Sequence, residues 1–253
     1  MSKDVKQIPW LEIQTPLPPA AAAQPQNASL AGLVAAGGGL SVPRLVEAYN
    51  SGIYPWYSEG QPVLWWSPDP RMVLHINEFK LHRSLRKTLQ KFTATQGCEI
   101  KFDSVFERVI RHCATHERSG QPGTWIVEDM IQAYVALHHA GFAHSVETWK
   151  DGELIGGLYC VSIGQAVFGE SMFALETDAS KIALSALVAF GRHNNIKCID
   201  CQQNTRHLAS LGAREIARAD FVEITHTSAK QNAMNWTFTP DHWNHLLQKT
   251  PAP

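Results

Sequence analysis

The chain has 253 residues and a formal net charge of −1 at pH 7, and 44% of its residues are hydrophobic against 18% charged. This balance is that of an ordinary globular protein and excludes a collagen, a coiled coil and a wholly disordered chain. Because Lys and Arg are balanced by Asp and Glu, a polyanionic partner would have to be held by a local basic patch.

The N-terminal sequence lacks the apolar stretch and the small-residue cleavage site of a secretory signal, so we expect a cytoplasmic protein without membrane attachment. The most apolar window, 154–173, contains several glycines together with Gln165 and Glu170. Two paired strands explain this window better than a membrane span. The five cysteines are scattered and odd in number, which does not predict a disulfide framework.

The first 50 residues contain many Pro and Gly residues, which interrupt helices and strands. Residues 15–26 are rich in Pro and Ala without an amphipathic stripe, and they predict an extended surface segment. The glycine run 37–39 permits tight backbone geometry. Ser41 and Pro43 then predict the start of a short helix that ends near Asn50.

Helical spacing appears after residue 80. Before it, residues 54–71 predict one strand flanked by rigid turns. Leu or Phe recurs at helical spacing from Leu81 to Phe92, and basic residues without any acid fill positions between them. A basic amphipathic helix is therefore predicted, and residues 104–115 and 128–139 predict two more helices.

After residue 140 the apolar residues change from helical to alternating spacing. Two tight turns, the first at Asp151-Gly152, separate three predicted strands, and Asp178 predicts a helix N-cap. This order predicts the α+β class and resembles the acyltransferase fold of acetyl-CoA-dependent N-acetyltransferases, although fold alone gives no chemistry. The predicted elements are strands over 144–150, 153–163 and 165–173, a helix over 178–190, a strand over 197–202, a helix over 207–211 and a strand over 215–223.

Asp200 and Gln202 form the first candidate site. In a strand they would share one face, roughly 7 Å apart. A carboxylate beside a carboxamide can orient and polarise it. The alternative is a polar pair on the solvent face of the strand. The apolar flanks favour a central strand, where a polar pair needs a reason.

Glu170 lies in a strand whose other members are apolar or small. We expect a carboxylate there to have a cationic partner. That partner is either an internal Arg or Lys, which is the usual structural answer, or a cationic group of a substrate.

Aromatic and basic residues suggest contacts with a nucleotide. Clustered aromatic rings can stack on a nucleobase, but at least two of five such rings are expected to serve packing. The basic helix is the only concentrated positive surface, and a phosphate contact competes with the plainer reading of a solvated face. The five rings are Tyr49, Trp56, Trp65, Trp66 and Trp125.

A metal or redox site is not favoured. Cys198 and Cys201 spell C-x-x-C, but positions i and i+3 of a strand face opposite sides. His112, Cys113 and His116 could complete a metal set only by long-range coincidence, so we expect no metal. The usual motifs for nucleotide hydrolysis, dinucleotide redox and hydrolase chemistry are missing from the sequence.

Several long motifs, in order from about 32 to 216, resemble the leucyl/phenylalanyl-tRNA–protein transferase family. The members of this bacterial family add Leu or Phe to proteins with N-terminal Arg or Lys. The sequence departs at residues 37–40, where Gly stands in place of the usual Asp before Leu40, and its Pro/Ala segment is longer. The motifs are Ala48-Tyr-Asn-Ser-Gly-Ile-Tyr-Pro-Trp56, Leu64-Trp-Trp-Ser-Pro-Asp-Pro-Arg71, Gly123-Thr-Trp-Ile126, Gly169-Glu-Ser-Met-Phe173 with Ala179-Ser-Lys181, and Ile199-Asp-Cys-Gln202 with Ser210-Leu-Gly-Ala213.

The resemblance implies a small N-terminal α/β domain over 1–75 and a catalytic domain over 76–253 with an acetyltransferase-like mixed sheet flanked by helices. It implies Asp200 and Gln202 as the catalytic pair and Glu170 near the α-amino end of the substrate. Further implied residues are Tyr49, Trp56 and Trp125 around the terminal adenosine and the reacting groups, and Leu158, Val167 and Phe173 as walls of the Leu or Phe pocket.

The implied reaction is aminolysis of the aminoacyl-tRNA ester, which needs alignment but no cofactor, metal or ATP. We expect Gln202 to accept a hydrogen bond from the attacking amine while Asp200 holds its amide, and both to face the cleft, so that replacing either by Ala abolishes transfer and keeps the fold. From the basic helix we expect Arg83, Arg86 and Lys87 to contact tRNA phosphates. The protein is expected to be a monomer that marks its acceptors for degradation.

Two rival functions remain open at this point. The first is a CoA-dependent N-acyltransferase, but the turn 174–180 is acidic and lacks the glycines that cradle a pyrophosphate. The second is a tRNA-binding protein without activity, which would keep the basic helix but have no use for the Asp200 and Gln202 pair.

Overall fold

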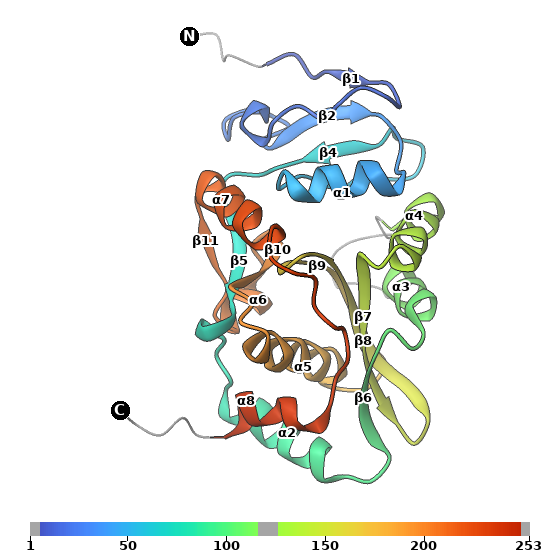
Figure 1. Ribbon diagram of the computed structural model, residues 1–253, viewed down its shortest axis with the longest axis vertical. Coiled ribbons are helices and arrows are strands. Elements are labelled where there is room, and N and C mark those ends of the chain that lie inside the picture. The colour runs from blue at the N-terminus through green and yellow to red at the C-terminus, as the bar shows by residue number, and fades with distance from the viewer. Residues whose placement is uncertain (1–5, 116–125, 249–253) are drawn as a thin grey trace.

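The computed structural model describes residues 6–115 and 126–248. Two sheets are stacked along the long axis of the molecule (Figure 1). The small sheet has the order β1-β2-β4-β3, with β1 parallel to β2 and the other pairs antiparallel. Its strands are β1 (Trp10–Leu11), β2 (Leu33–Gly37), β3 (Tyr54–Pro55) and β4 (Leu64–Trp66).

The large sheet has the order β11-β5-β10-β9-β8-β7-β6. Only β9 and β10 run parallel, and the helix α5 (Ala179–His193) connects them. All other neighbours are antiparallel. The strands are β5 (Arg71–His75), β6 (Cys98–Phe102), β7 (Ala143–Lys150), β8 (Glu153–Ile163), β9 (Ala166–Ala174), β10 (Cys198–Gln202) and β11 (Arg214–Ile216).

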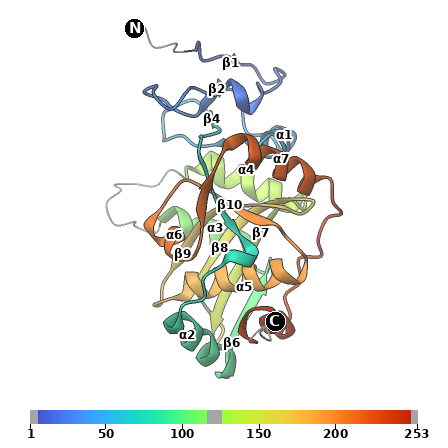
Figure 2. The same cartoon turned by 90° about the vertical axis from the view of Figure 1, so that its left-hand side faces the viewer.

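Helices cover both faces of the large sheet (Figures 1 and 2). One apolar core lies between the sheet and α5, α2 and α8, and a second lies on the other face against α3, α4, α7 and α1. The second core continues into the small sheet, so α1 joins the two layers. These helices are α1 (Val42–Asn50), α2 (Arg83–Ala94), α3 (Phe106–Thr115), α4 (Glu128–His139), α7 (Arg218–Ala229) and α8 (Asn244–Leu247), and α6 (Arg206–Ser210) precedes β11.

The local signals in the sequence act as expected at several positions. The Ser41 hydroxyl accepts a hydrogen bond from the backbone N–H of Arg44, which caps α1. Asp151 and Gly152 take positive φ angles of 51° and 81° in the turn between β7 and β8. The predicted α+β class, with a mixed sheet flanked by helices, is confirmed.

Three predictions about the N-terminal half and the helix caps need correction. The Pro/Ala segment is not only an extended surface segment, because Ala20 and Ala23 are buried in the core that reaches the small sheet. Residues 54–71 form no single strand, since they contain β3 and β4 of the small sheet and the first residue of β5 in the large sheet. Asp178 precedes α5 but makes no cap hydrogen bond, and its φ of 65° turns its carboxylate toward Lys181 instead.

The predicted strand over 215–223 is wrong beyond residue 216. Only β11 is extended, and α7 begins at Arg218. Phe221, Val222 and Ile224 look like strand residues locally, but the backbone N–H of Arg218 finds the Asp69 carboxylate as a cap, and Phe221 packs into the core. Tertiary contacts therefore override the β-branched pattern.

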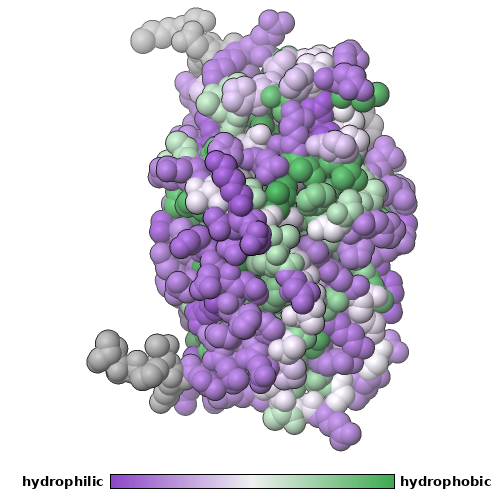
Figure 3. Space-filling model, in the orientation of Figure 1, coloured by the Kyte–Doolittle hydropathy of each residue, from purple (hydrophilic) through white to green (hydrophobic). Residues whose placement is uncertain are grey.

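None of the helices within the described ranges is both long and apolar enough to cross a membrane. The face in Figure 3 is mostly hydrophilic, and its apolar residues gather near the level of α1, where the two layers meet. β5 begins at Arg71 in the large sheet. A division into domains at residue 75 stays a prediction.

Candidate active site

Asp200 is fixed by a buried ion pair. The Nε and one terminal nitrogen of Arg71 donate to its two carboxylate oxygens at 2.8 and 2.6 Å, and the two side chains are 0% and 1% exposed. The Arg71 guanidinium also lies over the rings of Tyr54 and Phe221, with its carbon 4.7 and 4.5 Å from their centroids. Burial alone would lower the pKa of Arg71, but the Asp200 carboxylate raises it overall, so the guanidinium stays charged.

Gln202 lies at an irregularity at the end of β10. The register against β5 shifts between Asp200 and Gln202, and Gln202 has a left-handed φ of 61°. Its backbone N–H donates to an Asp200 oxygen at 2.9 Å. This bond corrects the expectation that Asp200 holds the side-chain amide, because Asp200 holds the backbone instead. Asp200 does not face an open cleft.

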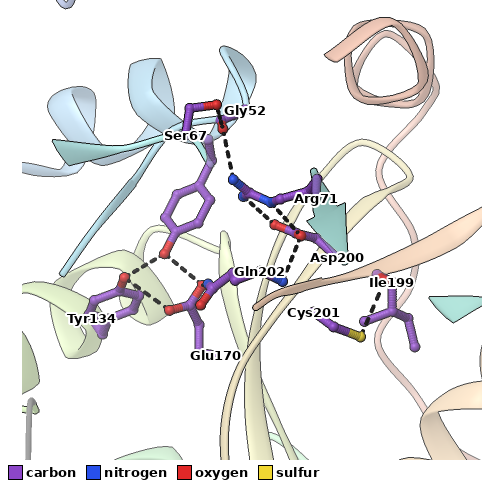
Figure 4. Close-up of polar contacts among 10 residues, drawn as sticks. Gly52, Ser67, Arg71, Tyr134, Glu170, Ile199, Asp200, Cys201 and Gln202 are labelled. Carbon is purple, nitrogen blue, oxygen red and sulfur yellow. Dashed lines mark hydrogen bonds and ion pairs between the residues drawn. The ribbon is translucent and has the colours of Figure 1, made fainter. Parts of the chain in front are cut away.

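The side-chain amide of Gln202 belongs to a different partner. Its Nε2 donates to a Glu170 carboxylate oxygen at 3.0 Å (Figure 4). β9 and β10 pair only through residues up to Phe168 and Asp200, so Glu170 and Gln202 lie just beyond the point where pairing ends. In the pairing of β9 with β8, Glu170 is the extra residue between Gly169 and Ser171. Irregular backbone on both strands thus turns the two side chains toward each other across the gap.

Glu170 accepts hydrogen bonds from hydroxyl groups, and an internal Arg or Lys, one of the two expected partners, is not what it contacts in the described residues. The Tyr49 hydroxyl donates to one carboxylate oxygen at 2.7 Å and the Tyr134 hydroxyl to the other at 3.3 Å, and the two hydroxyls also contact each other. No Lys or Arg of the described residues forms an ion pair with Glu170. Arg71, the buried arginine nearby, forms its ion pair with Asp200.

The electrostatics of this group follow from its burial. Desolvation raises the pKa of Glu170 to about 7, the nearby Asp200 charge adds to the rise, and the hydrogen bonds from Tyr49, Gln202 and Tyr134 oppose it. Burial also raises the pKa of Tyr49 and Tyr134 well above the ordinary value, so both hydroxyls stay protonated and can donate. Near neutral pH the carboxyl group of Glu170 is therefore only partly ionised, because its burial disfavours the charged form.

The raised pKa of Glu170 should make the free energy of unfolding depend on pH. Because the folded pKa of Glu170 lies above its ordinary 4.5, the folded state binds more protons between pH 4.5 and 7, and the free energy of unfolding should fall as the pH rises through that window. In Glu170→Gln this contribution is absent. The difference between the two proteins, on the order of 3 kcal/mol across the window, is measured by urea unfolding at pH 5 to 8. Parallel stability curves would contradict the raised pKa.

The predicted pocket walls do not come together. Leu158 and Val167 lie in the core against α5, whereas Phe173 lies in the core against α3 and stacks on His112 with ring centroids 4.7 Å apart. The three residues thus face opposite sides of the large sheet. These three residues therefore cannot line one pocket for a Leu or Phe side chain.

The predicted aromatic residues also separate. Tyr49 is 0% exposed and contacts Glu170, so its ring offers no stacking face to a nucleobase. Trp56 is half-buried, and its ring packs edge-on against Trp66 with centroids 5.7 Å apart. Trp125 lies outside the described residues. Trp56 remains a candidate stacking surface.

Two contributors to the site were not identified from the sequence. Arg71 follows a Pro-Asp-Pro run and gives no local sign of burial, and Tyr134 looks like one more core residue of α4. Only the register of β5 against β10 and the packing of α4 bring them to the site. Among the residues that the structure describes, no cluster of three or more His, Cys, Asp or Glu side chains could hold a metal ion.

Comparisons with known proteins agree on one family. A family model described as leucyl/phenylalanyl-tRNA protein transferase matches residues 73–226, and the model of its N-terminal domain matches residues 38–69. The leucyl/phenylalanyl-tRNA–protein transferase of Polaromonas sp. is 60% identical over 247 residues, which cover 98% of this chain and 97% of that protein. The protein of the same name from Albidiferax ferrireducens is 54% identical, with the same coverage.

Similarity to solved structures is weaker. The structure of a GCN5-related N-acetyltransferase-like protein from Streptococcus suis aligns with a TM-score of 0.32 and 13% identity. The aligned part covers 67% of this chain and 61% of the Streptococcus suis chain.

Proposed function

The chain belongs to the leucyl/phenylalanyl-tRNA–protein transferase family and is a transferase. From this premise we propose that it moves Leu or Phe from aminoacyl-tRNA to the α-amino group of proteins that begin with Arg or Lys, and thereby marks them for degradation. The observation that carries the proposal is the contact between Glu170 and Gln202 at the point where β9 and β10 stop pairing. A buried carboxylate that pairs with no Lys or Arg of the described residues meets a carboxamide there.

The donor brings most of the driving force. Its amino acid is attached as an ester, so attack by an amine to form an amide is downhill and requires alignment of two substrates. The amine nitrogen bonds to the carbonyl carbon, the bond to the ribose oxygen breaks, and the proton lost by nitrogen passes to that oxygen. The neighbouring ribose hydroxyl can relay this proton. An acceptor α-amino group has an ordinary pKa of about 7.7–8.0, so part of it is neutral near pH 7.

Glu170 is suited to hold the α-ammonium group of the bound aminoacyl ester. Its carboxylate lacks a Lys or Arg partner among the described residues, and hydroxyls from Tyr49 and Tyr134 fix both oxygens. A cationic substrate group would supply the missing charge and favour the ionised form of the carboxyl. Tyr49 thus acts as a positioning residue for Glu170 and not as a stacking platform for adenosine.

Gln202 is suited to align the attacking amine. Because its Nε2 donates to Glu170, the amide orientation is set, and Oε1 can accept a hydrogen bond from the amine. The amide does not titrate near neutral pH, so its contribution is alignment and not base catalysis. Asp200 and Arg71 hold the backbone of Gln202 and are positioning residues.

A transfer assay tests the function. The protein is incubated with an acceptor peptide that begins with Arg and with either radiolabelled Leu-tRNA or radiolabelled acetyl-CoA. We expect label in the peptide only from Leu-tRNA, also with Phe-tRNA and with a peptide that begins with Lys, and not with one that begins with Asp. Label from acetyl-CoA would support the CoA-dependent acyltransferase, and tRNA binding without transfer would support a protein that only binds tRNA.

The basic helix α2 is proposed to bind the tRNA further from the reacting ester. Arg83 and Lys87 are exposed, whereas the guanidinium of Arg86 donates to the Leu247 carbonyl at 2.9 Å and so is partly committed to the fold. In Arg83→Gln/Lys87→Gln we expect a higher KM for Leu-tRNA. The slope of log kcat/KM against log salt should become shallower by about 1–2, since each duplex phosphate contact contributes about 0.9.

The matched control is Lys230→Gln, which removes an exposed cation after α7. This variant should keep both the KM and the salt slope of the unmodified protein. A salt slope in the α2 double variant that equals the control would remove α2 from the tRNA-binding surface.

A further inference from the structure

Three helices meet on the α5 face of the large sheet. The His82 ring at the start of α2 contacts the carbonyl of Ser210 in α6 at 2.7 Å. Further along α2, the Thr88 hydroxyl donates to Asp178 at 3.4 Å, and Asp178 pairs with Lys181 of α5 at 2.7 Å. These contacts join α2, α6 and the first turn of α5 into one surface, which we call the three-helix surface.

This surface is rich in cations that the fold leaves available. Lys181 has 40% of its side chain exposed, Arg206 is exposed, and His207 is half-buried. Within the described residues, neither Arg206 nor the α2 residues Arg83 and Lys87 forms an ion pair. Of these cations, Lys181 is the one that forms an ion pair in the described residues, and its partner is Asp178.

The surface continues directly from the two strands that carry the site. α6 begins four residues after Gln202, which is at most about 14 Å of extended chain. α5 begins five residues after the end of β9, the strand that carries Glu170. In the sequence, Lys181 therefore lies closer to Glu170, and His207 closer to Gln202, than the cations of α2 do.

We propose that the three-helix surface binds the phosphate backbone of the single-stranded 3′ end of the donor tRNA, with Lys181 and His207 at the phosphates next to the terminal adenosine and α2 further along. This inference rests on the proposed function. The 3′ terminal CCA is common to all tRNAs, so contacts to its backbone suffice, and the choice of Leu or Phe is left to the amino acid.

The chemistry of the two residues suits a phosphate. Burial and the nearby Lys181 charge lower the pKa of His207, so its imidazole is neutral in the free enzyme and donates through one N–H. A phosphate would favour the protonated imidazole and would compete with Asp178 for the Lys181 ammonium. Asp178 therefore opposes binding in this arrangement, and its removal should strengthen it.

Kinetics with three donors of different length test the proposal. The donors are Leu-tRNA, a leucyl-CCA trinucleotide and leucyl-adenosine, which has no phosphate, and the readout is the ratio of kcat/KM between donors. In Lys181→Gln and in His207→Gln we expect the ratio of leucyl-CCA to leucyl-adenosine to fall about tenfold. Asp178→Asn, which suits the left-handed φ of 65°, should raise the same ratio.

The double variant of Arg83 and Lys87 should lower only the ratio of Leu-tRNA to leucyl-CCA, and Lys230→Gln should change neither ratio. Ratios that stay constant in Lys181→Gln and His207→Gln would overturn the inference, as would a lower ratio in Asp178→Asn. If the unmodified protein transfers Leu from none of the donors, the proposed function itself fails.

A binding measurement provides a second readout without turnover. The pKa of His207 is followed by NMR while an unreactive CCA trinucleotide is added. We expect the pKa to rise on binding, because the phosphate stabilises the imidazolium. A pKa that does not move at saturating trinucleotide would overturn the contact.

Discussion

Asp200→Ala is expected to lower the thermal stability of the protein by roughly 10 °C, besides abolishing transfer. The substitution leaves the Arg71 guanidinium, 0% exposed, without its carboxylate. Removing one partner of a buried ion pair costs about 3–5 kcal/mol, because the remaining charge is desolvated and unpaired. For a chain of this size each kcal/mol shifts Tm by about 2–4 °C. The sequence-based expectation is that the variant keeps the fold, and the structure adds that the fold should be less stable.

The matched control removes both charges. In Arg71→Met/Asp200→Leu no charge is left buried alone, so a large part of the lost stability should return. Transfer should stay lost, since the backbone N–H of Gln202 no longer has its acceptor. Both proteins are compared with the unmodified one by thermal unfolding and by transfer from Leu-tRNA. A Tm of Asp200→Ala within 2 °C of the unmodified protein, a margin set from the same scaling, would mean that the pair contributes little to the fold.

Local patterns in the sequence predicted the secondary structure where neighbouring residues determine it. The cap at Ser41, the Asp151-Gly152 turn and the helical spacing over 128–139 all act within a few residues, and the structure has the predicted elements there. α7 was missed because its apolar residues follow no clear helical spacing, and its start depends on Asp69, about 150 positions earlier in the chain.

The candidate site shows the same division. Glu170, Asp200 and Gln202 could be selected from the sequence because polar residues in apolar strands need a reason. Their partners could not be predicted. Arg71 reaches Asp200 only through the register of β5 against β10, and Tyr134 reaches Glu170 only through the packing of α4. The bulges that turn Glu170 and Gln202 toward each other leave no local sequence signal.

The loss of the Gln202 side chain should have the largest effect on the reaction. In Gln202→Ala no amide oxygen is left to accept from the amine, and Glu170 loses one of its hydrogen-bond donors. Misalignment of the reacting groups by about 1 Å can cost on the order of 10²-fold in rate, and we expect a loss at least that large. Because Gln202 is only partly buried, the stability should change little.

Two further variants separate alignment from backbone strain. Gln202→Asn keeps an amide and suits a left-handed φ, but its side chain is one carbon shorter and should not reach both Glu170 and the amine. Its loss should therefore approach that of Gln202→Ala. Gln203→Ala removes a chemically identical side chain from the next, exposed position, whose hydrogen bond is to Tyr54 and not to Glu170, and it should keep nearly full activity.

The decisive measurement is the single-turnover rate of transfer from saturating Leu-tRNA to a peptide that begins with Arg, made on proteins with matched Tm values. A rate about 10²-fold lower in Gln202→Ala and Gln202→Asn, with Gln203→Ala near the unmodified protein, is the result expected if alignment at Glu170 and Gln202 drives the reaction. Equal rates in the Gln202 and Gln203 variants would contradict it.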